Sequence, residues 1–179
     1  LDGVLNLNMD VTLSSLSGEA TGTITRAIPG PGILTVSGTA SSTYGGAIHN
    51  GTGTLSLVKG GTSTLILAGT NDYSDGTTIA GGILQANASS ALGSGAVAIN
   101  GGVRLSLGEG VTLENAITVG TNTSPQGGGL LTASAAVTGN ATLLGPVSIT
   151  NSALGGGHFV NAGTGTFDVK SVITSTVAI

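Results

Sequence analysis

The stretch from Gly45 to Asn100 is a succession of short runs in which β-branched or Leu residues alternate with Thr and Ser. Only Gly, Ser, Asn, Asp or Thr stand between the runs, which are Gly53–Val58, Ser63–Ala68, Gly76–Ile79, Gly82–Ala86 and Gly95–Ile99. Alternation over so few residues, bounded by turn-forming residues, is typical of strands with very short connections. No comparable stretch has apolar residues at helical spacing, so the sequence predicts an all-β chain.

The same rhythm extends over the rest of the chain. Strands are expected within residues 4–13 and at Gly22–Ile28, Ile33–Ser37, Val103–Leu107, Val111–Leu113, Ala116–Val119, Leu130–Val137, Ala141–Leu144, Val147–Thr150, Phe159–Val160, Thr166–Val169 and Val172–Val177. The sharpest turn is expected at Pro29-Gly30-Pro31-Gly32, because Pro lacks a ladder donor and Gly adopts unusual dihedral angles. Thr121–Gly129 has no apolar residue and is predicted to be a projecting loop.

Composition indicates a narrow core rather than a wide one. The chain has 33 Gly, two Tyr, two Phe and no Trp among 179 residues, so Val, Ile, Leu and Ala must fill the interior. Charged residues make up only 7% of the chain, which leaves Thr, Ser and Asn to cover the surface. An ordinary apolar fraction with low net charge is the reverse of the disordered signature.

Similar phrases recur along the chain and favour a solenoid over a sandwich. Each begins with Gly and continues with Leu, Ile, Val or Thr, and the phrases start at Gly32, Gly53, Gly82, Gly102, Gly129 and Gly165. Their spacing of about 20 to 36 residues is that of repeat proteins, in which each coil buries the apolar face of its neighbour. The sequence predicts a parallel β-helix of roughly nine short coils, each of roughly 20 residues. Residues 1–179 are expected to form a single segment, a piece of a longer surface protein.

Charge and cysteine content exclude some classes of function. The net charge is −4, and the chain has four bases, Arg26, Lys59, Arg104 and Lys170. Because they are scattered along the sequence, they are not expected to form a nucleic-acid-binding patch. The absence of cysteine is compatible with an extracellular protein that does not depend on disulfides. No apolar run is long enough to cross a bilayer as a helix, so no membrane insertion by this segment is expected.

Between residues 44 and 120 several phrases follow one another in an order known from one family. They include Gly53-Thr54-Leu55-Ser56-Leu57-Val58-Lys59-Gly60-Gly61, Thr64-Leu65-Ile66-Leu67-Ala68-Gly69, Asn71-Asp72-Tyr73-Ser74-Asp75-Gly76 and Gly82-Ile83-Leu84-Gln85. Tyr44-Gly45-Gly46-Ala47-Ile48 precedes them, and Ala91-Leu92-Gly93-Ser94-Gly95 follows. The stretch resembles the passenger-associated strand repeat of bacterial autotransporters. The resemblance implies a right-handed parallel β-helix outside a Gram-negative-type bacterium, with no catalytic residues in the repeat; Asp72 and Asp75 depart from its usual small turn residues.

An enzyme that acts on polysaccharides is a competing hypothesis, because such enzymes also use β-helices. It requires clustered carboxylates and a base, and here only the pairs Asp72/Asp75 and Glu109/Glu114 are close in sequence. Lys59 or Arg104 could reach one of the pairs only if coiling brings them together. We expect no enzyme and no catalytic residue.

Two places in the sequence invite a metal-binding hypothesis. The carboxylates of Asp72 and Asp75 could hold Ca²⁺, but an Asx-type turn in which these side chains and Asn71 satisfy local amides is favoured. His49 and His158 are far apart and lack partners at ligand spacing, so both are expected on the surface or in turns. No metal and no cofactor are predicted.

Threonine pairs suggest a further alternative, a flat face that binds ice or a glycan lattice. The pairs are Thr52/Thr54, Thr62/Thr64, Thr77/Thr78 and Thr164/Thr166. Thr is also the commonest uncharged polar residue on the solvent face of strands, so the pairs alone do not demonstrate such a face.

The sequence thus predicts a structural or adhesive β-helix rod of a bacterial secreted or cell-surface protein. Its expected partners are other copies of itself, through open ladder ends that could grow a fibre, or a host or surface glycan or matrix component. A glycan- or ice-binding surface is the second hypothesis, and a polysaccharide-active enzyme is the third.

Overall fold

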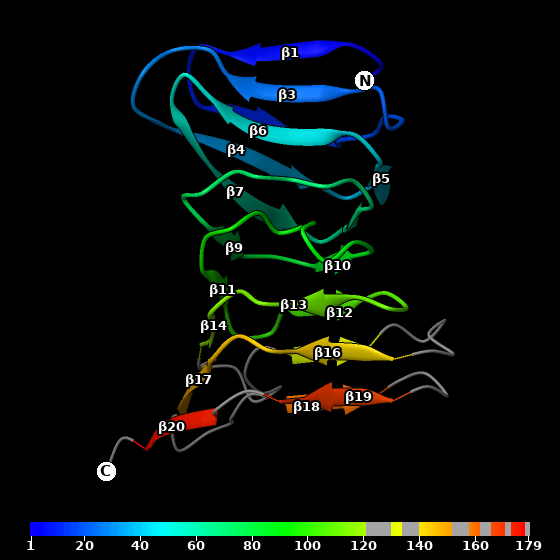
Figure 1. Cartoon of the computed structure of the whole chain (residues 1–179), viewed down its shortest axis with the longest axis vertical. Helices are drawn as coiled ribbons and strands as arrows, with labels where there is room; N and C mark the ends of the chain where they lie inside the picture. Colours follow the sequence, from blue (N-terminus) through cyan, green and yellow to red (C-terminus); the bar gives the residue numbers. More distant parts are fainter. Residues whose placement is uncertain (121–129, 134–139, 152–157, 162–165, 171–172, 178–179) are drawn as a thin grey trace.

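The chain winds into a stack of coils built from parallel strands, with the first coil at one end and the last at the other (Figure 1). The computed structural model describes residues 1–120, 130–133, 140–151, 158–161, 166–170 and 173–177. The strands are β1 (Val4–Leu7), β2 (Val11–Leu13), β3 (Thr23–Arg26), β4 (Pro31–Gly38), β5 (Ser42–Tyr44), β6 (Ala47–Gly51), β7 (Thr54–Gly61), β8 (Thr64–Leu67), β9 (Thr77–Ile79), β10 (Ile83–Ala86), β11 (Val97–Ile99), β12 (Arg104–Leu107), β13 (Thr112–Leu113), β14 (Ile117–Val119), β15 (Leu130–Ala133), β16 (Ala141–Leu143), β17 (Val147–Asn151), β18 (His158–Asn161), β19 (Phe167–Val169) and β20 (Ile173–Val177).

Three sides of the stack are formed by these strands. The first side is an eight-stranded sheet, here the long sheet, in the order β2-β4-β7-β9-β11-β14-β17-β20. The second is a six-stranded sheet in the order β18-β15-β12-β10-β8-β5, and the third carries two separate sheets, β1-β3-β6 and β13-β16-β19. The predicted all-β parallel solenoid is therefore confirmed. No helix among the described residues is long and apolar enough to span a membrane.

The register of the long sheet shows how the length of a coil varies. The residues aligned in successive coils are Val11, Leu34, Leu57, Thr77, Val97, Ile117 and Val147. The three coils from Leu57 to Ile117 are equal in length, the two before them are slightly longer, and the one that ends at Val147 is longer still. Because several coils exceed the roughly 20 residues expected for each, there are somewhat fewer coils than the predicted roughly nine.

The core consists of files of aliphatic side chains that stack from coil to coil. One file on the long sheet contains Ile79, Ile99 and Val119, which are buried and occupy aligned register positions. A file on the second sheet contains Leu65, Leu84 and Leu105. Since alternate residues of a strand face opposite ways, in-register stacking places each inward residue over the inward residue of the previous coil.

Lys59 interrupts one aliphatic file. It lies between Val36 and Ile79 in the register of the long sheet, and its side chain is fully buried. Its ammonium donates hydrogen bonds to the carbonyl oxygens of Gly60 at 2.5 Å and Gly81 at 3.2 Å. Burial lowers the pKa of Lys59, because desolvation disfavours the charged form.

The carbonyl groups that accept from Lys59 belong to a corner made of Gly-Gly pairs. Gly61 and Gly82 have positive φ angles of 63° and 62°, a region that favours glycine. A Cβ atom on Gly81 would lie 2.3 Å from the carbonyl oxygen of Gly61, so successive corners stack too closely for any side chain there.

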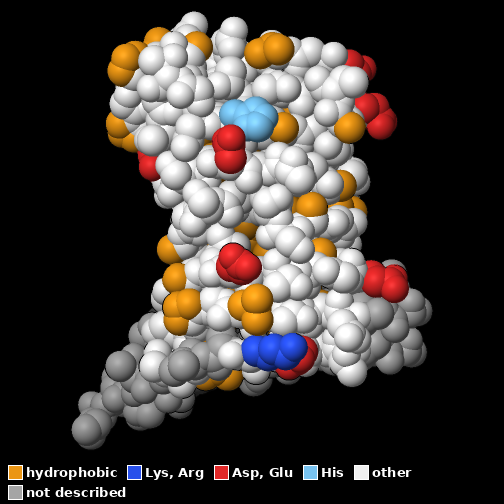
Figure 2. All heavy atoms as spheres, in the orientation of Figure 1, with side chains coloured by type: hydrophobic (Ala, Val, Ile, Leu, Met, Phe, Trp, Pro, Cys, Tyr) orange, Lys and Arg blue, Asp and Glu red, His pale blue; other side chains and the backbone are white. Residues whose placement is uncertain are grey.

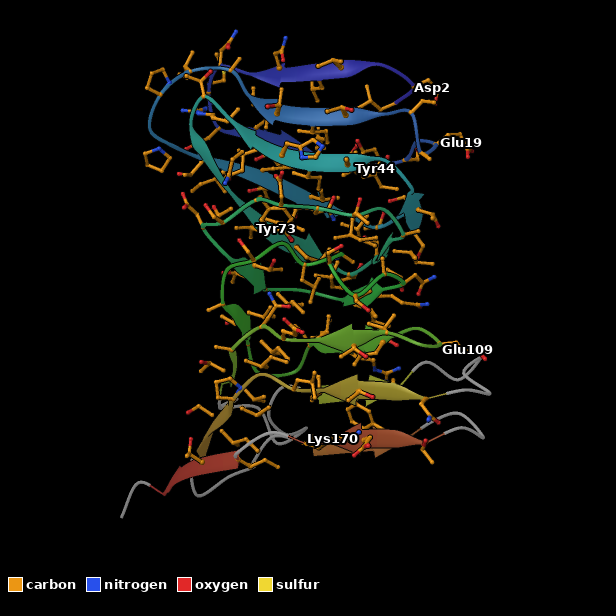
Figure 3. All side chains as sticks on the ribbon, in the orientation of Figure 1. Asp2, Glu19, Tyr44, Tyr73, Glu109 and Lys170 are labelled. Atoms are coloured by element: carbon orange, nitrogen blue, oxygen red, sulfur yellow. The ribbon has the colours of Figure 1, made fainter. Side chains whose placement is uncertain are left out.

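Two tyrosines are fully buried in the interior (Figure 3): Tyr44 at the end of β5, and Tyr73 in a coil that has no strand on the third side. The Tyr44 hydroxyl donates to the carbonyl oxygen of Ala47 at 3.3 Å, and the Tyr73 hydroxyl shares a 2.7 Å hydrogen bond with Thr77 Oγ1. Desolvation raises the pKa of Tyr44 to about 12 and raises that of Tyr73 above its ordinary value as well. Both hydroxyls therefore keep their protons to a higher pH in the folded chain than in the unfolded chain.

Arg26 is a second buried base. Its Nη2 atom donates to the carbonyl oxygen of Pro31 at 3.1 Å, while Nε and Nη1 are buried and have no hydrogen-bond partner among the described residues. The guanidinium lies against Gly32, where a Cβ atom would come within 2.9 Å of it. Buried donors without acceptors are costly, so these two groups of Arg26 lower the stability of the fold.

The structure differs from the predicted strands in three places. Residues 4–13 form two strands in different sheets, β1 and β2, because the chain turns a corner between them. Strand β4 begins at Pro31, inside the predicted turn. A proline is tolerated at the first position of a strand, although it has no N–H group to donate to the hydrogen-bond ladder. Strands β5 and β6 were not predicted, because Gly45 and Gly46 between them hide the alternation.

In the alkaline range, the unfolding free energy should pass through a maximum near pH 10. From the lowered pKa of Lys59 up to about 10.4, the unfolded chain binds more protons than the folded one, so stability rises with pH. Above about pH 10 the unfolded tyrosines lose protons that folded Tyr44 and Tyr73 retain, so stability falls. Urea unfolding across this range should show the maximum. Lys59→Met should reduce the rise of the unfolding free energy below pH 10, and Tyr44→Phe should reduce its fall above pH 10. Unchanged slopes in both variants would contradict the assignment of the pH dependence to these side chains.

Arg26→Met should stabilise the protein. The change removes two unsatisfied buried donors and keeps an unbranched apolar stem, so we expect a gain of about 1–3 kcal/mol in the free energy of unfolding. Arg104→Met is the matched control, because Arg104 is exposed on β12 and should change stability by less than about 0.5 kcal/mol. A loss of stability in Arg26→Met would show that the guanidinium is satisfied in solution.

Candidate functional site

The third side of the solenoid is interrupted at mid-length. Strand β6 ends the sheet β1-β3-β6, and β13 begins the sheet β13-β16-β19. On this side, the two coils between them have no strand and consist of irregular backbone at residues 68–76 and 87–96. Hydrogen bonds show that these segments lie in the gap: Asp72 N donates to Ile48 O at 3.1 Å, and Asn71 N donates to Ser90 O at 3.2 Å. The body is also narrowest midway along its length (Figure 2).

A groove of about 600 Å³ lies over this gap, and we call it the waist groove. Its lining comes from three successive coils and consists of Thr70, Asn71, Asp72, Ala88, Ser89, Ser90, Gly93, Ser94, Thr112 and Glu114. The lining combines hydroxyl groups with two carboxylates and contains no aromatic side chain. This groove is the strongest candidate site among the described residues.

Asparagine side chains hold the coils together where the strand ladder is missing. Asn71 is buried; its Oδ1 atom accepts from Ile48 N at 2.8 Å and its Nδ2 atom donates to Ala91 O at 2.5 Å. It therefore links the coil before it to the coil after it. Asn115 donates in the same manner to the carbonyl oxygens of Gly93 and Gly95, at 3.0 and 2.8 Å. These amides replace the backbone hydrogen bonds that a strand would make.

Asn50 organises the upper edge of the gap. Its Oδ1 atom accepts from Leu55 N at 3.0 Å and Ser74 N at 3.1 Å, and its Nδ2 atom donates to Ser74 Oγ at 3.0 Å. The Asn50-Gly51 pair is typical of a turn, and in the structure the Asn50 side chain also joins two coils.

Asp72 and Asp75 have separate partners. Asp72 Oδ1 accepts from Asn50 N at 3.2 Å, and Asp72 Oδ2 lies 2.9 Å from His49 Nδ1. Asp75 Oδ2 accepts from Thr54 Oγ1 at 2.5 Å. The sequence predicted that these side chains and Asn71 bind local amides, whereas the structure places the partners of both carboxylates on the preceding coil. Among the described residues no three His, Asp or Glu side chains are grouped closely enough to hold a metal ion.

The histidines occupy strands. His49 lies on β6 and is partly exposed, and its Nδ1 atom contacts the carboxylate of Asp72. His158 begins β18, where its backbone pairs with Leu130.

The residues of the enzyme hypothesis do not come together in the described part of the chain. The two acids of the waist groove are Asp72 and Glu114, and neither Lys59 nor Arg104 lines it. Lys59 is inside the core, and Arg104 is exposed on the second sheet. Asp2, Glu19 and Glu109 lie along one side of the stack (Figure 3).

The predicted threonine pairs do not form one face. Thr77 is buried and bonds to Tyr73, because it occupies an inward position between Leu57 and Val97. Thr64 is on the second sheet, and Thr164 lies outside the described residues. The projecting loop predicted at Thr121–Gly129 also lies outside them.

The register shows a different outward file on the long sheet, here the threonine file. It contains Thr12, Thr35, Val58, Thr78, Ala98, Thr118, Ser148 and Thr174. Sequence spacing alone did not reveal this file, because the distance along the chain between its members changes from coil to coil. The file carries no charge and is one residue wide.

Comparison with known proteins agrees with the family resemblance. Residues 57–86, from β7 to the end of β10, match the family described as the passenger-associated-transport-repeat. The chain is also similar to the adhesin BmaC autotransporter of Brucella suis biovar 1 (strain 1330), with 34% identity over 144 residues. That similarity covers 76% of this chain and 4% of the Brucella protein, so the chain spans a small part of its relative. No solved structure matches.

Asn71→Ala should destabilise the protein by about 2–4 kcal/mol. The change leaves the buried Ile48 N–H and the Ala91 carbonyl without their partner, and each such loss costs about 1–3 kcal/mol. Urea unfolding followed by far-UV circular dichroism provides the measurement. Asn100→Ala is the control, since Asn100 is exposed and should change stability by less than about 0.5 kcal/mol. Equal effects of the two changes would mean that Asn71 does not bridge the coils.

Proposed function

Because residues 57–86 carry an autotransporter passenger repeat, we propose that this chain is a rigid segment of an adhesive protein on the outer surface of a Gram-negative-type bacterium. The similarity to an autotransporter adhesin supports the adhesive role. Its partner is a host or surface component, and its action is mechanical rather than catalytic.

The construction of the solenoid supports a role as a rod. Every strand pair described is parallel, and the ladders continue from coil to coil. The interior is filled by stacked aliphatic files, and the chain contains no cysteine. Rigidity outside the cell then depends on repeated hydrogen bonds and burial, which need no redox chemistry.

The surface supports contact with uncharged partners. Charged residues make up 7% of the chain, and basic side chains are scarce on the face shown in Figure 2. An acidic polymer such as nucleic acid finds no basic patch to bind. Self-association into fibres stays a prediction of the sequence, and the ice-binding and polysaccharide-degrading alternatives stay hypotheses.

Cells that carry the native protein provide the test. Antibody fragments raised against this chain should label intact cells and reduce their attachment to host cells or matrix, and external protease should remove the label. Fragments raised against an abundant unrelated surface protein are the control. Labelling only after the cells are opened would contradict surface display; labelling without any effect on attachment would contradict adhesion through this segment. Sedimentation of the purified protein separately tests self-association.

A further inference from the structure

We propose that the waist groove binds a neutral, hydroxyl-rich oligosaccharide. This inference rests on the adhesive function proposed above and names the chemistry of its ligand. It is carried by the position of the groove, by its free polar groups and by the charges around it.

The position of the groove gives it a defined size. Its lining residues come from three successive coils, at residues 70–72, 88–94 and 112–114. Neighbouring strands are about 4.8 Å apart, so three coils extend about 10 Å along the stack. This length suits a short oligosaccharide better than a large folded partner. The asparagine bridges beneath it fix the backbone, so the groove is formed before a ligand arrives.

The polar groups of the lining are available for a ligand. Thr70, Ser90, Ser94 and Thr112 have side-chain hydroxyls that make no hydrogen bond with the described residues, and Glu114 has no ion pair there. A hydroxyl both donates and accepts, whereas a carboxylate only accepts. Sugar hydroxyls can satisfy both kinds of group, and the carbon surface of Ala88 and of the Thr and Ser side chains can pack against sugar C–H groups.

Charge separates neutral sugars from acidic ones. Asp72 and Glu114 line the groove, and the one base that contacts either of them in the described structure is His49, which pairs with Asp72. Lys59 is enclosed in the core, and Arg104 lies on the second sheet. A carboxylated or sulfated sugar would therefore meet like charge with no compensating cation.

Charge also argues against a basic peptide. The carboxylate of Asp72 already has His49 at 2.9 Å and the Asn50 amide at 3.2 Å, which leaves Glu114 as the free charge of the groove. One exposed carboxylate gives little affinity for a cation in water. The free hydroxyls outnumber it, so a neutral ligand matches the lining better.

Affinity for a single sugar chain should be weak, with a dissociation constant of about 1 mM, because the groove offers no aromatic ring for stacking. Binding is therefore measured on a panel of immobilised oligosaccharides, because many copies of a sugar on one surface strengthen weak binding. The panel contains neutral hexose and N-acetylhexosamine oligosaccharides, their sialylated and sulfated counterparts, and an octalysine peptide. The analyte is the purified native protein.

Three variants locate the binding. Ser94→Phe places a ring in the groove at an exposed position and should reduce binding of the neutral oligosaccharides at least about tenfold. Thr118→Phe is the matched control on the threonine file of the long sheet and should leave binding unchanged. Glu114→Gln keeps the shape of the side chain and tests its role as an acceptor. Circular dichroism verifies the fold of each variant.

The outcomes separate this inference from the proposed function. Neutral sugars that bind with little dependence on salt, and lose binding in Ser94→Phe but not in Thr118→Phe, support the groove as the site. Preference for sialylated or sulfated sugars, salt-sensitive capture by octalysine, no binding to any sugar, or equal loss in both Phe variants overturns it. Cell attachment that is blocked by antibody but unaffected by Ser94→Phe would leave the adhesive function standing and place its contact elsewhere.

Discussion

The structure depends on parallel in-register stacking, in which a strand inside a sheet pairs with the strand one coil before it and the strand one coil after it. That ladder fixes the distance between coils and forces every inward side chain onto the one below it. It explains why Leu, Ile and Val can form a sufficient core in a chain with two Phe and no Trp. It also explains why an exception such as Lys59 needs carbonyl groups from two coils to be tolerated.

Where the strand ladder is absent, side-chain amides form the hydrogen bonds between coils. The gap between β6 and β13 leaves backbone groups of two coils without strand partners, and Asn71, Asn115 and Asn50 supply substitutes. The same irregular coils create the waist groove. The feature that could have weakened the rod is thus also the feature that provides a concave, polar surface.

Fold class was predictable because alternation and recurring Gly-initiated phrases are local signals, and most predicted strands were found. The strands that were missed, β5 and β6, flank Gly45-Gly46, where the pattern is interrupted. The candidate site was harder to predict. The lining of the waist groove combines residues two coils apart, Thr70 and Glu114, and no sequence pattern links them. Thr77, which the alternative hypothesis of a threonine face would place on the surface, lies inside, where its hydroxyl has a buried partner in the Tyr73 hydroxyl. The sequence predicts that Asp72 and Asp75 bind local amides, and only the coil register shows that their partners lie on the preceding coil.

The equal length of the three coils from Leu57 to Ile117 has a consequence for how such a chain can change over generations. Removal or duplication of one whole coil leaves each remaining strand a neighbour of the correct face and length. Gain or loss of a single residue within a strand turns its inward side chains to the solvent. Heritable variation in this region should therefore add or remove whole coils. The length of the rod can then vary, while the alternation of inward and outward residues in each strand is conserved.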